Sequence, residues 1–548
     1  MNKLFLIGII FLIVLGTLNT NSDCLNGTVY YDQNEESYSI KLGKIDKTNG
    51  AAFGTFCDEI EQTGWSRLYV NSSRNYDNNV QMFSGGYLEG FLSQHRIYQY
   101  FNNFYKDTFG TSQPSQKLVD FLQEQENYLL SQFEENKKGK FDKEISLWWD
   151  HIEYLYQQMQ GVYAGYSDAA PENETLSYFQ IYLLINAGDL EDLIPAYMTG
   201  EYCWLTEDQC LTYWLLHGSC TALVKMLPDY SDIYAAHNLW TSYANMLRVF
   251  KFYAFDLVDA DVSATAFSFS GKPGDLQSKD DFYVTTSNLV ILETSIPLLS
   301  NATWKYFSPE TVPAWMRTIA ATRLARSGKE WVDIFTPHNS GTHNAEWVIL
   351  DLNVYRQNEA PDYKDLVWIV EAVPGITLSK DVTSFVRDNL WFASYNIPYF
   401  PEIFEMTGYI QMVEKFGDWF SWEDCPRARI LHRDHSEVVD FSTMKDLMLN
   451  NYFQVDPLSD GFPFNQLCAR YDLIPVPNSY NFLPYAYGCV DAKVSSFKRV
   501  KSLVSDTISG PTHQYQSVFV WDEEWQNVPH LGQPEKFDFD FVTMHPIW

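Results

Sequence analysis

Basic residues are scarce in this sequence. Its 548 residues include 38 Lys and Arg against 70 Asp and Glu, which gives a formal net charge of −32 at pH 7. A chain this acidic is repelled by phosphate backbones and by anionic membranes at neutral pH, so the composition argues against nucleic-acid partners. The repulsion weakens as carboxylates take up protons at about pH 4 to 5, which would suit an acidic compartment.

Several familiar signatures of enzymes are also missing. The sequence contains no Gly-x-Ser-x-Gly elbow, no His-Glu-x-x-His helix and no Gly-rich phosphate loop. The "HRDH" stretch places His432 and His435 three residues apart without a Cys ligand nearby, which is more typical of a solvated face than of a metal pair. The basic cluster of Arg427, Arg429 and Arg433 could grip a carboxylate or phosphate, although internal ion pairs are the simpler interpretation. We expect no metal or organic cofactor.

Long apolar runs are absent except at the N-terminus. There, Met1 to Lys3 carries a positive charge, Leu4 to Leu15 is almost wholly apolar, and Thr17 to Asp23 is polar. This is the layout of a secretory signal peptide, and the run is too short to span a bilayer. We therefore predict a signal peptide over residues 1–22, no later membrane segment, and delivery to the outside of the cell or to the lysosome. Four glycosylation acceptor sites support this route: Asn26, Asn71, Asn173 and Asn301.

Cysteines are few, and a secretory route predicts that most of them form disulfides. The eight are Cys24, Cys57, Cys203, Cys210, Cys220, Cys425, Cys468 and Cys489. Cys203 with Cys210 would close a short loop, and Cys468 with Cys489 is another plausible pair, but the sequence alone does not fix the connectivity. If Cys220 is unpaired, seven cysteines remain, so at least one more must be unpaired as well.

The pattern of apolar residues changes along the chain. From about Gly86 to Tyr166 it is mainly helical, whereas after Cys220 short stretches rich in Val, Ile, Tyr and Phe alternate with turns and further helices. We find no internal repeat and no low-complexity linker. Helices first, followed by strands with helices, predict an α+β layered fold rather than alternating βαβ units.

Cys220 stands in "LLHGSCTALVKMLP", at the start of an apolar strand. A cysteine in such a place is usually a packing residue, and a disulfide is the other simple interpretation. One catalytic mechanism also explains the pattern. If the Ser219–Cys220 bond were cut, the new α-amine could take the proton of the neighbouring thiol, as in terminal-nucleophile hydrolases. The small residues Gly218 and Ser219 would allow the backbone strain that an N-to-S acyl shift requires.

Several long blocks, in the right order, carry a resemblance to a known family. They are "CTALVKMLPDYSDIYAAHNLWTSYANMLRVFKFY", "DDFYVTTSNLVILETSI", "HNSGTHNAEWVILD", "WFASYNIPYF", "GDWFSWEDCPRARI" and "LGQPEKFDFDFV", with "FNNFYKDTFG" less strongly. From about Tyr87 to Trp548 the sequence resembles the phospholipase B-like (lamina-ancestor-type) proteins of the N-terminal nucleophile hydrolase superfamily. Such a match is far more specific than any single motif.

The resemblance implies a four-layer αββα sandwich with a helical N-terminal portion. It also implies a precursor that is cut before Cys220 into two chains that stay associated. Residues 23–219 would form a mostly helical chain of roughly 23 kDa packed on the core. Residues 220–548 would form most of the αββα core and weigh roughly 38 kDa before glycans. A homo-oligomer remains open.

The same resemblance implies roles for individual residues. Cys220 would be the nucleophile and, through its amine, the base. His237 could orient that amine, Asn238 could donate to the developing oxyanion, and Trp240 could wall the pocket. Without the resemblance, His237 would be read as capping a turn and Trp240 as a core residue.

Further candidates come from other blocks. Asn344 in "GTHNAEW" would supply a second amide donor with Thr342 beside it, or would simply hold a bend, and Ser287 in "TTSNL" would approach from a neighbouring strand. Two features depart from the family pattern, namely the residues before the nucleophile, His217 to Ser219, and His343, where an aromatic residue would fit better. Neither removes a proposed catalytic group, and His343 could alter the local pH dependence.

The resemblance implies an acyl hydrolase that releases fatty acids from glycerophospholipids through an acyl-thioester on Cys220, and this substrate class rests on the family's name rather than on any residue. The site would serve amides equally well, so an amidase acting on N-acyl lipids or short peptides is an alternative. An apolar channel lined by residues such as Trp240 and Phe267 would favour long acyl chains, whereas a shallow polar cleft would favour peptides. A third hypothesis is a lumenal glycoprotein that binds a ligand without catalysis.

Overall fold

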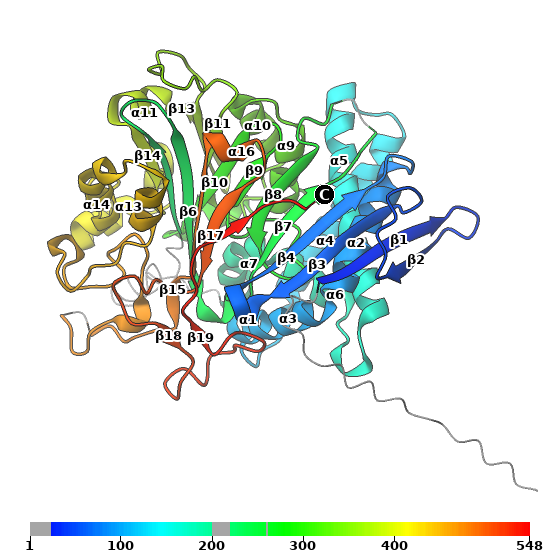
Figure 1. The fold of residues 1–548 in the computed structure, drawn as a ribbon, viewed down its shortest axis with the longest axis horizontal. Helices are drawn as coiled ribbons and strands as arrows, with labels where there is room; N and C mark the ends of the chain where they lie inside the picture. The colour runs from blue at the N-terminus through cyan, green and yellow to red at the C-terminus, as the bar shows by residue number, and fades with distance from the viewer. Residues whose placement is uncertain (1–23, 200–219, 259–260, 480, 548) are drawn as a thin grey trace, which may run out of the picture.

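Two large β-sheets dominate the computed structural model, which describes residues 24–199, 220–258, 261–479 and 481–547 (Figure 1). The larger sheet has eleven strands in the order β13-β12-β11-β10-β9-β8-β7-β4-β3-β1-β2. The second has seven strands, β14-β5-β6-β16-β17-β20 with β15 beside β6, and β18 and β19 form a separate pair. The α+β prediction is confirmed.

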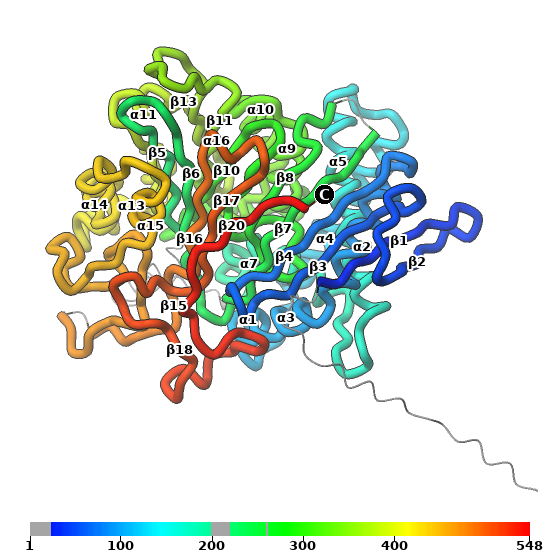
Figure 2. Tube along the Cα trace, viewed as in Figure 1, coloured from blue at the N-terminus to red at the C-terminus, as the bar shows by residue number. Residues whose placement is uncertain are grey.

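The strands of the eleven-stranded sheet come from both sides of Cys220. They are β1 (Cys24–Asp32), β2 (Ser37–Leu42), β3 (Ala52–Glu59), β4 (Trp65–Ser72), β7 (Val249–Ala254), β8 (Ala266–Gly271), β9 (Phe282–Thr285), β10 (Leu289–Ser295), β11 (Ala345–Asp351), β12 (Val367–Val373) and β13 (Ile376–Asp381). All neighbours in this sheet are antiparallel except β4 and β7, which run parallel. Figure 2 shows the blue N-terminal strands lying against the green strands that follow Cys220.

The seven-stranded sheet carries Cys220 at the start of one of its inner strands. Its members are β5 (Cys220–Met226), β6 (Ile233–Ser242), β14 (Trp391–Ser394), β15 (Tyr487–Cys489), β16 (Asp491–Ser496), β17 (Ser505–Ser509) and β20 (Val542–Met544). The separate pair is β18 (Phe519–Val520) and β19 (Lys536–Phe537). The turn between β5 and β6 contains Pro228 and Asp229, and the Asp229 carboxylate accepts from the Ser231 N–H at 3.0 Å, which favours a tight reversal.

Helices cover the outer face of each sheet. The eleven-stranded sheet packs against α2 (Asn78–Leu92), α3 (Gln94–Phe109), α4 (Gln116–Lys137), α5 (Lys143–Ala169), α6 (Tyr178–Ile185), α7 (Ala187–Ile194), α9 (Ala314–Leu324) and α10 (Gly328–Phe335). The seven-stranded sheet packs against α12 (Pro401–Met406), α13 (Tyr409–Phe416), α14 (Pro426–Asp434) and α15 (Phe441–Met448). Three short α-helices complete those of the described residues: α1 (Ile60–Thr63), α11 (Thr383–Asn389) and α16 (Phe497–Val500). No helix in the described ranges is both long and apolar enough to cross a bilayer.

A third apolar core lies between the two sheets. Ala222 and Val224 of β5 meet Phe250 and Phe252 of β7 and further residues of both sheets there. Because side chains alternate along a strand, Cys220 shares the face of Ala222 and Val224 and points toward this inter-sheet space.

Glycines let the two main N-terminal helices approach closely. A Cβ added to Gly86 of α2 would lie 1.9 Å from the Gln158 carbonyl oxygen of α5, and one on Gly161 would lie 2.1 Å from the Phe83 carbonyl oxygen. This close approach is one that only glycine permits. The predicted helical region from Gly86 to Tyr166 is confirmed and falls within α2 to α5.

Two disulfides join described cysteines, Cys24 to Cys57 and Cys468 to Cys489. The second confirms a predicted pair. Cys220 and Cys425 are both buried and unpaired, so the expectation that a free Cys220 has an unpaired companion agrees with the structure. Cys203 and Cys210, like the predicted signal peptide and Ser219, lie outside the described residues.

The four predicted glycosylation sites all reach solvent. Asn173 and Asn301 are exposed, whereas Asn26 in β1 and Asn71 in β4 are partly exposed. Their use stays a prediction.

Candidate active site

Cys220 is the first residue of β5 and lines a cavity of about 300 Å³. It pairs with Leu239 across β5 and β6, and only 1% of the residue is exposed. Burial raises the pKa of its thiol well above the usual range, and the nearby Glu293 and Asp281 raise it further. The thiol is therefore protonated at neutral pH and needs a base before it can act as a nucleophile.

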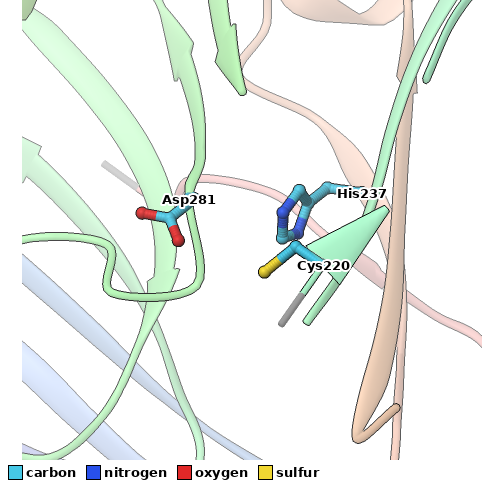
Figure 3. A group of neighbouring side chains, drawn as sticks. All are labelled: Cys220, His237 and Asp281. Atoms are coloured by element: carbon cyan, nitrogen blue, oxygen red, sulfur yellow. The ribbon is translucent and has the colours of Figure 1, made fainter. Parts of the chain in front are cut away.

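His237 of β6 lies beside the thiol on the same face of the sheet (Figure 3). Its Nε2 is 2.8 Å from the backbone carbonyl oxygen of Glu293, so this nitrogen carries the proton that is donated. Its Nδ1 is buried and has no hydrogen-bond partner among the described residues. Burial, with Lys493 nearby, holds the pKa of the imidazole well below its usual range, so the ring is neutral.

Two carboxyl groups complete this cluster from the other sheet. Asp281, just before β9, contributes an oxygen that lies within 4.8 Å of the Cys220 sulfur and of a His237 ring nitrogen. Asp281 also lies within 4.8 Å of Glu293 and His343, measured between potential ligand atoms. Burial raises the pKa of Asp281, and burial together with Asp281 raises the pKa of Glu293 well above its usual range. The cluster therefore spans the gap between the two sheets.

The backbone of Cys220 is held by two distant residues. The Asn396 Oδ1, just after β14, accepts from the Cys220 N–H at 3.2 Å. Arg427, at the start of α14, donates to the Cys220 carbonyl oxygen and, at 2.9 Å, to the same Asn396 Oδ1. Its guanidinium also lies 4.3 Å from the centre of the Trp240 ring. Arg427 and Asn396 together thus fix the position of the Cys220 backbone at the start of β5.

Three residues around the site hold left-handed backbone conformations. The φ angles are 57° at Asp281, 52° at His343 and 70° at Asn396. Asp, His and Asn are the non-glycine residues that tolerate this region best.

Trp240 and Asn238, both predicted site residues, lie on the face of β6 away from His237. Trp240 still lines the cavity, and its backbone N–H is directed at the Cys220 thiol. Asn238 is occupied elsewhere, because its Nδ2 donates to the Met448 carbonyl oxygen at 2.6 Å and to the Leu467 carbonyl oxygen at 3.1 Å. The structure does not bring the Asn238 amide to the thiol.

Thr342 and Asn344 contact α7 rather than the thiol. The Thr342 hydroxyl donates to Asp189 at 2.5 Å, and the Asn344 backbone N–H donates to Asp192 at 3.1 Å. Burial raises the pKa of Asp192 to about 7. Of this stretch, His343 lines the cavity, and neither of its two neighbours is among the lining residues.

Ser287 lies in the turn between β9 and β10, where its hydroxyl is 3.0 Å from the Thr285 hydroxyl. That turn is at the opposite end of β9 from Asp281, so Ser287 does not join the site. Phe267, expected to line an acyl channel, instead packs in the core between the eleven-stranded sheet and its helices.

The basic cluster divides between the surface and the site. Arg429 pairs with Asp418, and Arg433 pairs with Asp434 and Asp456, as the simpler interpretation predicted. Only Arg427 is buried beside Cys220. His435, from "HRDH", lies 3.4 Å from the Lys225 amine and away from this cluster.

The rest of the cavity wall is mixed in character. Its charged members include Lys272 and Lys279 as well as Glu191, with Lys279 and Glu191 paired at 2.8 Å. Apolar and aromatic side chains form part of the wall: Phe104, Ala187, Leu190, Ile194, Pro195, Leu239, Trp240 and Tyr487. Polar side chains form another part: Asp107, Thr108, Thr241, Ser242, Asn245 and Ser295.

Comparison with known proteins decides the family. Residues 52–544 match the family model described as Phospholipase B. The chain belongs to the phospholipase B-like family. It is 36% identical to human "Phospholipase B-like 1" over 526 residues, which is 95% of this chain and 91% of that protein. It is 34% identical to "Phospholipase B" of Crotalus adamanteus over 98% of this chain and 95% of that protein.

Other relatives are more distant. "Phospholipase B-like protein A" of Dictyostelium discoideum is 32% identical over 97% of this chain and 94% of that protein. Among solved structures, a mutant of the conjugated bile acid hydrolase from Clostridium perfringens aligns with a TM-score of 0.29 and 11% identity, covering 60% of this chain and 97% of that chain.

Sequence reasoning missed several members of this phospholipase B-like site. Asn396 lies within a block that carried the family resemblance, yet nothing local distinguishes it from other asparagines. Asp281 and Glu293 lie at the two ends of the block "DDFYVTTSNLVILETSI", from which Ser287 was chosen instead. A usable signal for Glu293 was a carboxylate inside an apolar strand, since a buried carboxylate is costly unless a partner or a function accounts for it.

Proposed function

We propose that this protein is an acyl hydrolase that releases fatty acids from glycerophospholipids through an acyl-thioester on Cys220. Cleavage of the Ser219–Cys220 bond would activate it. The observation that carries this proposal is the position of Cys220. It is the first residue of an inner strand, its thiol reaches a cavity, and its backbone nitrogen already has a side-chain acceptor in Asn396.

The order of layers is consistent with such an enzyme. The three largest apolar cores lie between helices and the eleven-stranded sheet, between the two sheets, and between the seven-stranded sheet and its helices. We infer that this is the αββα sandwich of the N-terminal nucleophile hydrolases, with the nucleophile facing the space between the sheets. The relatives' names supply the substrate class, and we extend it to this chain as part of the proposal.

Cleavage would turn the Cys220 amide nitrogen into an amine that remains beside Asn396 and Arg427. The nearby guanidinium disfavours a second positive charge, so it would keep part of the amine unprotonated. The amine then takes the thiol proton, and the sulfur attacks the ester carbonyl carbon. The carbonyl electron pair moves to oxygen, which gives a tetrahedral oxyanion.

Collapse of that intermediate breaks the ester C–O bond, and the amine returns its proton to the departing alcohol. The acyl group is left as a thioester on Cys220. A water molecule then attacks the thioester while the amine takes one water proton. The fatty acid leaves, and the proton returns to sulfur. For the oxyanion we assign the Trp240 backbone N–H as a donor, because it is directed at the thiol, in place of the Asn238 amide.

The cavity lining favours one alternative substrate class. Lys272, Lys279 and Glu191 place charges near the thiol, and Phe267 does not extend an apolar channel from it. An amidase that acts on N-acyl lipids or short peptides would use the same nucleophile and the same proton transfers. For both the esterase and the amidase, we propose that the protein is delivered to the lysosome or to the outside of the cell.

The test begins with the mature protein. N-terminal sequencing is expected to yield a chain that begins Cys-Thr-Ala-Leu. Hydrolysis is then compared between Cys220→Ala and Cys425→Ala, since both replace a buried, unpaired thiol. We expect activity to vanish in the first variant and to persist in the second.

Two results would overturn the proposal. One is a chain that runs unbroken through Ser219–Cys220, and the other is full lipid release by Cys220→Ala. An unbroken chain would favour a binding glycoprotein without catalysis, whereas full lipid release by Cys220→Ala would mean that a group other than Cys220 is the nucleophile. Comparing phosphatidylcholine with an N-acyl-ethanolamine as substrates separates the esterase from the amidase.

A further inference from the structure

Three kinds of metal-ligating group converge at Cys220. Its sulfur, a His237 ring nitrogen and an Asp281 carboxylate oxygen all lie within 4.8 Å of one another (Figure 3). Thiolate, imidazole and carboxylate are the ligands that Zn²⁺ prefers in proteins. All three residues are buried, and they come from both sheets, so neither sheet alone creates the site.

The cluster leaves two potential ligand atoms without a close hydrogen bond to any described residue, although the His343 Nε2 lies 3.9 Å from the Asp281 Oδ1. Because His237 donates through Nε2 to the Glu293 carbonyl, its Nδ1 keeps a lone pair, and this atom has no partner among the described residues. The Asp281 Oδ1 is likewise buried without a hydrogen-bond partner in the described chain. Asp281 therefore does not orient the imidazole, as the acid of a catalytic triad would, because a carbonyl oxygen already does so.

The spacing also fits a tetrahedral ion. Zn²⁺ bonds of about 2.0 to 2.3 Å set ligand-to-ligand separations of about 3.3 to 3.6 Å. Groups within 4.8 Å reach these separations when each side chain moves by a fraction of an ångström to about 1 Å. Glu293 and His343, both within 4.8 Å of Asp281, surround this ligand as outer groups that fix its orientation.

We propose that Cys220, His237 and Asp281 form a Zn²⁺-binding site, and that the bound ion blocks the nucleophile. The ion enters through the cavity that Cys220 and Asp281 line. A Zn–S bond forms as the S–H bond breaks, and the proton leaves to solvent. The sulfur lone pair is then committed to the metal and does not attack an acyl carbonyl. The inhibition rests on the proposed function, whereas the binding does not.

Cleavage before Cys220 would strengthen the site. The freed α-amine and the thiolate of one cysteine would close a five-membered chelate ring around the ion. The amine would thus supply a fourth ligand beside sulfur, imidazole and carboxylate. Zn²⁺ is therefore expected to hold the cleaved enzyme more tightly than an uncleaved chain.

The test uses the purified full protein after dialysis against a chelator. Co²⁺ is titrated in as a spectroscopic probe, and its thiolate bond is read from the sulfur-to-cobalt charge-transfer band in the near ultraviolet. We expect one equivalent to bind and stoichiometric Zn²⁺ to displace it. The band should be absent in Cys220→Ala and unchanged in Cys425→Ala, the matched buried thiol.

The other two ligands are tested by Asp281→Asn and His237→Gln, each of which keeps the size of its side chain. Each is expected to weaken metal binding at least tenfold. Circular dichroism identifies which variants are folded. In a folded variant the buried Cys220 thiol should also react with a thiol reagent at the rate seen in the parent protein. A folded variant of either kind that binds Co²⁺ as tightly as the parent, or a charge-transfer band that survives in Cys220→Ala, would overturn the site.

Inhibition is measured separately with micromolar Zn²⁺, and a chelator should restore hydrolysis. If hydrolysis depends on Cys220 but no metal binds there, this inference fails and the proposed function stands. If metal binds at Cys220 but no hydrolysis occurs, the proposed function fails and the site stands.

Discussion

Arg427 holds the backbone of the proposed nucleophile, Cys220, although it is not among the residues that line the cavity. Its guanidinium donates to the Cys220 carbonyl, to Asn396 and to the Tyr395 carbonyl oxygen. A planar fork can hold several acceptors at once, whereas a lysine offers only a point charge. We expect Arg427→Lys to lower hydrolysis by about 10²-fold, because small displacements of a nucleophile have effects of this size. Steady-state kinetics of the folded variant would measure it.

The control for that prediction lies two residues away. Arg429 belongs to the same helix but pairs with Asp418 at the surface. Arg429→Lys should leave both hydrolysis and stability close to those of the parent, since exposed ion pairs contribute little. Equal losses in the two variants would show that Arg427 acts only through general stability.

At this scale the sequence predicted some side chains and not others, for physical reasons. Cys220 and His237 come together because they lie on one face of neighbouring strands, and strand alternation is a local rule. The same rule turns Asn238 away, since it is one residue out of phase with His237. Asn396 and Arg427 reach Cys220 across 176 and 207 residues of chain, and no local pattern encodes such contacts.

A buried carboxyl pair links β11 and β12. Glu346 and Glu371 are cross-strand partners, and both are buried. Burial and mutual repulsion raise the pKa of Glu346 well above its usual range, and burial raises the pKa of Glu371 to about 7. The folded state therefore binds more protons than the unfolded state between about pH 4.5 and 7, so stability falls as the pH rises through this window.

Glu346→Gln should remove much of that dependence, because a neutral amide cannot repel Glu371. We expect the variant to melt a few degrees higher than the parent at pH 7 and to show a flatter profile from pH 4.5 to 7. Differential scanning calorimetry across this range would measure it. A variant whose melting temperature falls with pH as steeply as that of the parent would contradict the assignment.

The disulfide between Cys468 and Cys489 supports the wall of the site. Leu467, next to Cys468, accepts hydrogen bonds at its carbonyl oxygen from Thr221 and from the Trp240 indole N–H. Cys489 pairs directly with Trp240 between β15 and β6. Replacing both cysteines with serine should destabilise the fold by about 3 kcal/mol and also lower hydrolysis. Denaturant unfolding and kinetics would measure the two effects.

The Cys24–Cys57 disulfide is the matched comparison. It spans 33 residues against 21, so loop-closure entropy predicts a similar loss of stability. It joins β1 and β3 near one edge of the eleven-stranded sheet, whereas Cys220 belongs to the seven-stranded sheet. Its removal should leave the activity of the folded protein unchanged. Equal losses of activity in both double variants would mean that the losses come from reduced stability and not from a specific effect of the Cys468–Cys489 disulfide on the site.

For the whole molecule, the proposed cut would separate segments that share one sheet, because β4 before Cys220 pairs with β7 after it. Among the described residues, each disulfide joins cysteines on one side of Cys220 only. We expect the cleaved protein to migrate as one species in native conditions. In denaturant without reductant it should separate into fragments of roughly 23 and roughly 38 kDa before glycans. Fragments that separate in native buffer would contradict the shared sheet.

Fold class was predictable from the sequence because long helical periodicity and short β-rich runs are local signals. The region from Gly86 to Tyr166 is helical as predicted. The four strands that precede it, β1 to β4, were not predicted as part of the sheet. Their places in the sheet depend on the pairing of β4 with β7, which lies far along the chain, and local propensity does not encode such pairing.

The parallel pairing of β4 with β7 would also affect the rate at which the cleaved protein is irreversibly inactivated. Before a cut at Cys220, the two strands belong to one chain and find each other within it. After the cut, an unfolded molecule would be two molecules, and its recovery would depend on their meeting in dilute solution. Each unfolding event would then be a permanent loss, and the working lifetime would be set by the rate of unfolding rather than by the equilibrium. Maturation would thus give the protein its activity and make its folding irreversible in the same step.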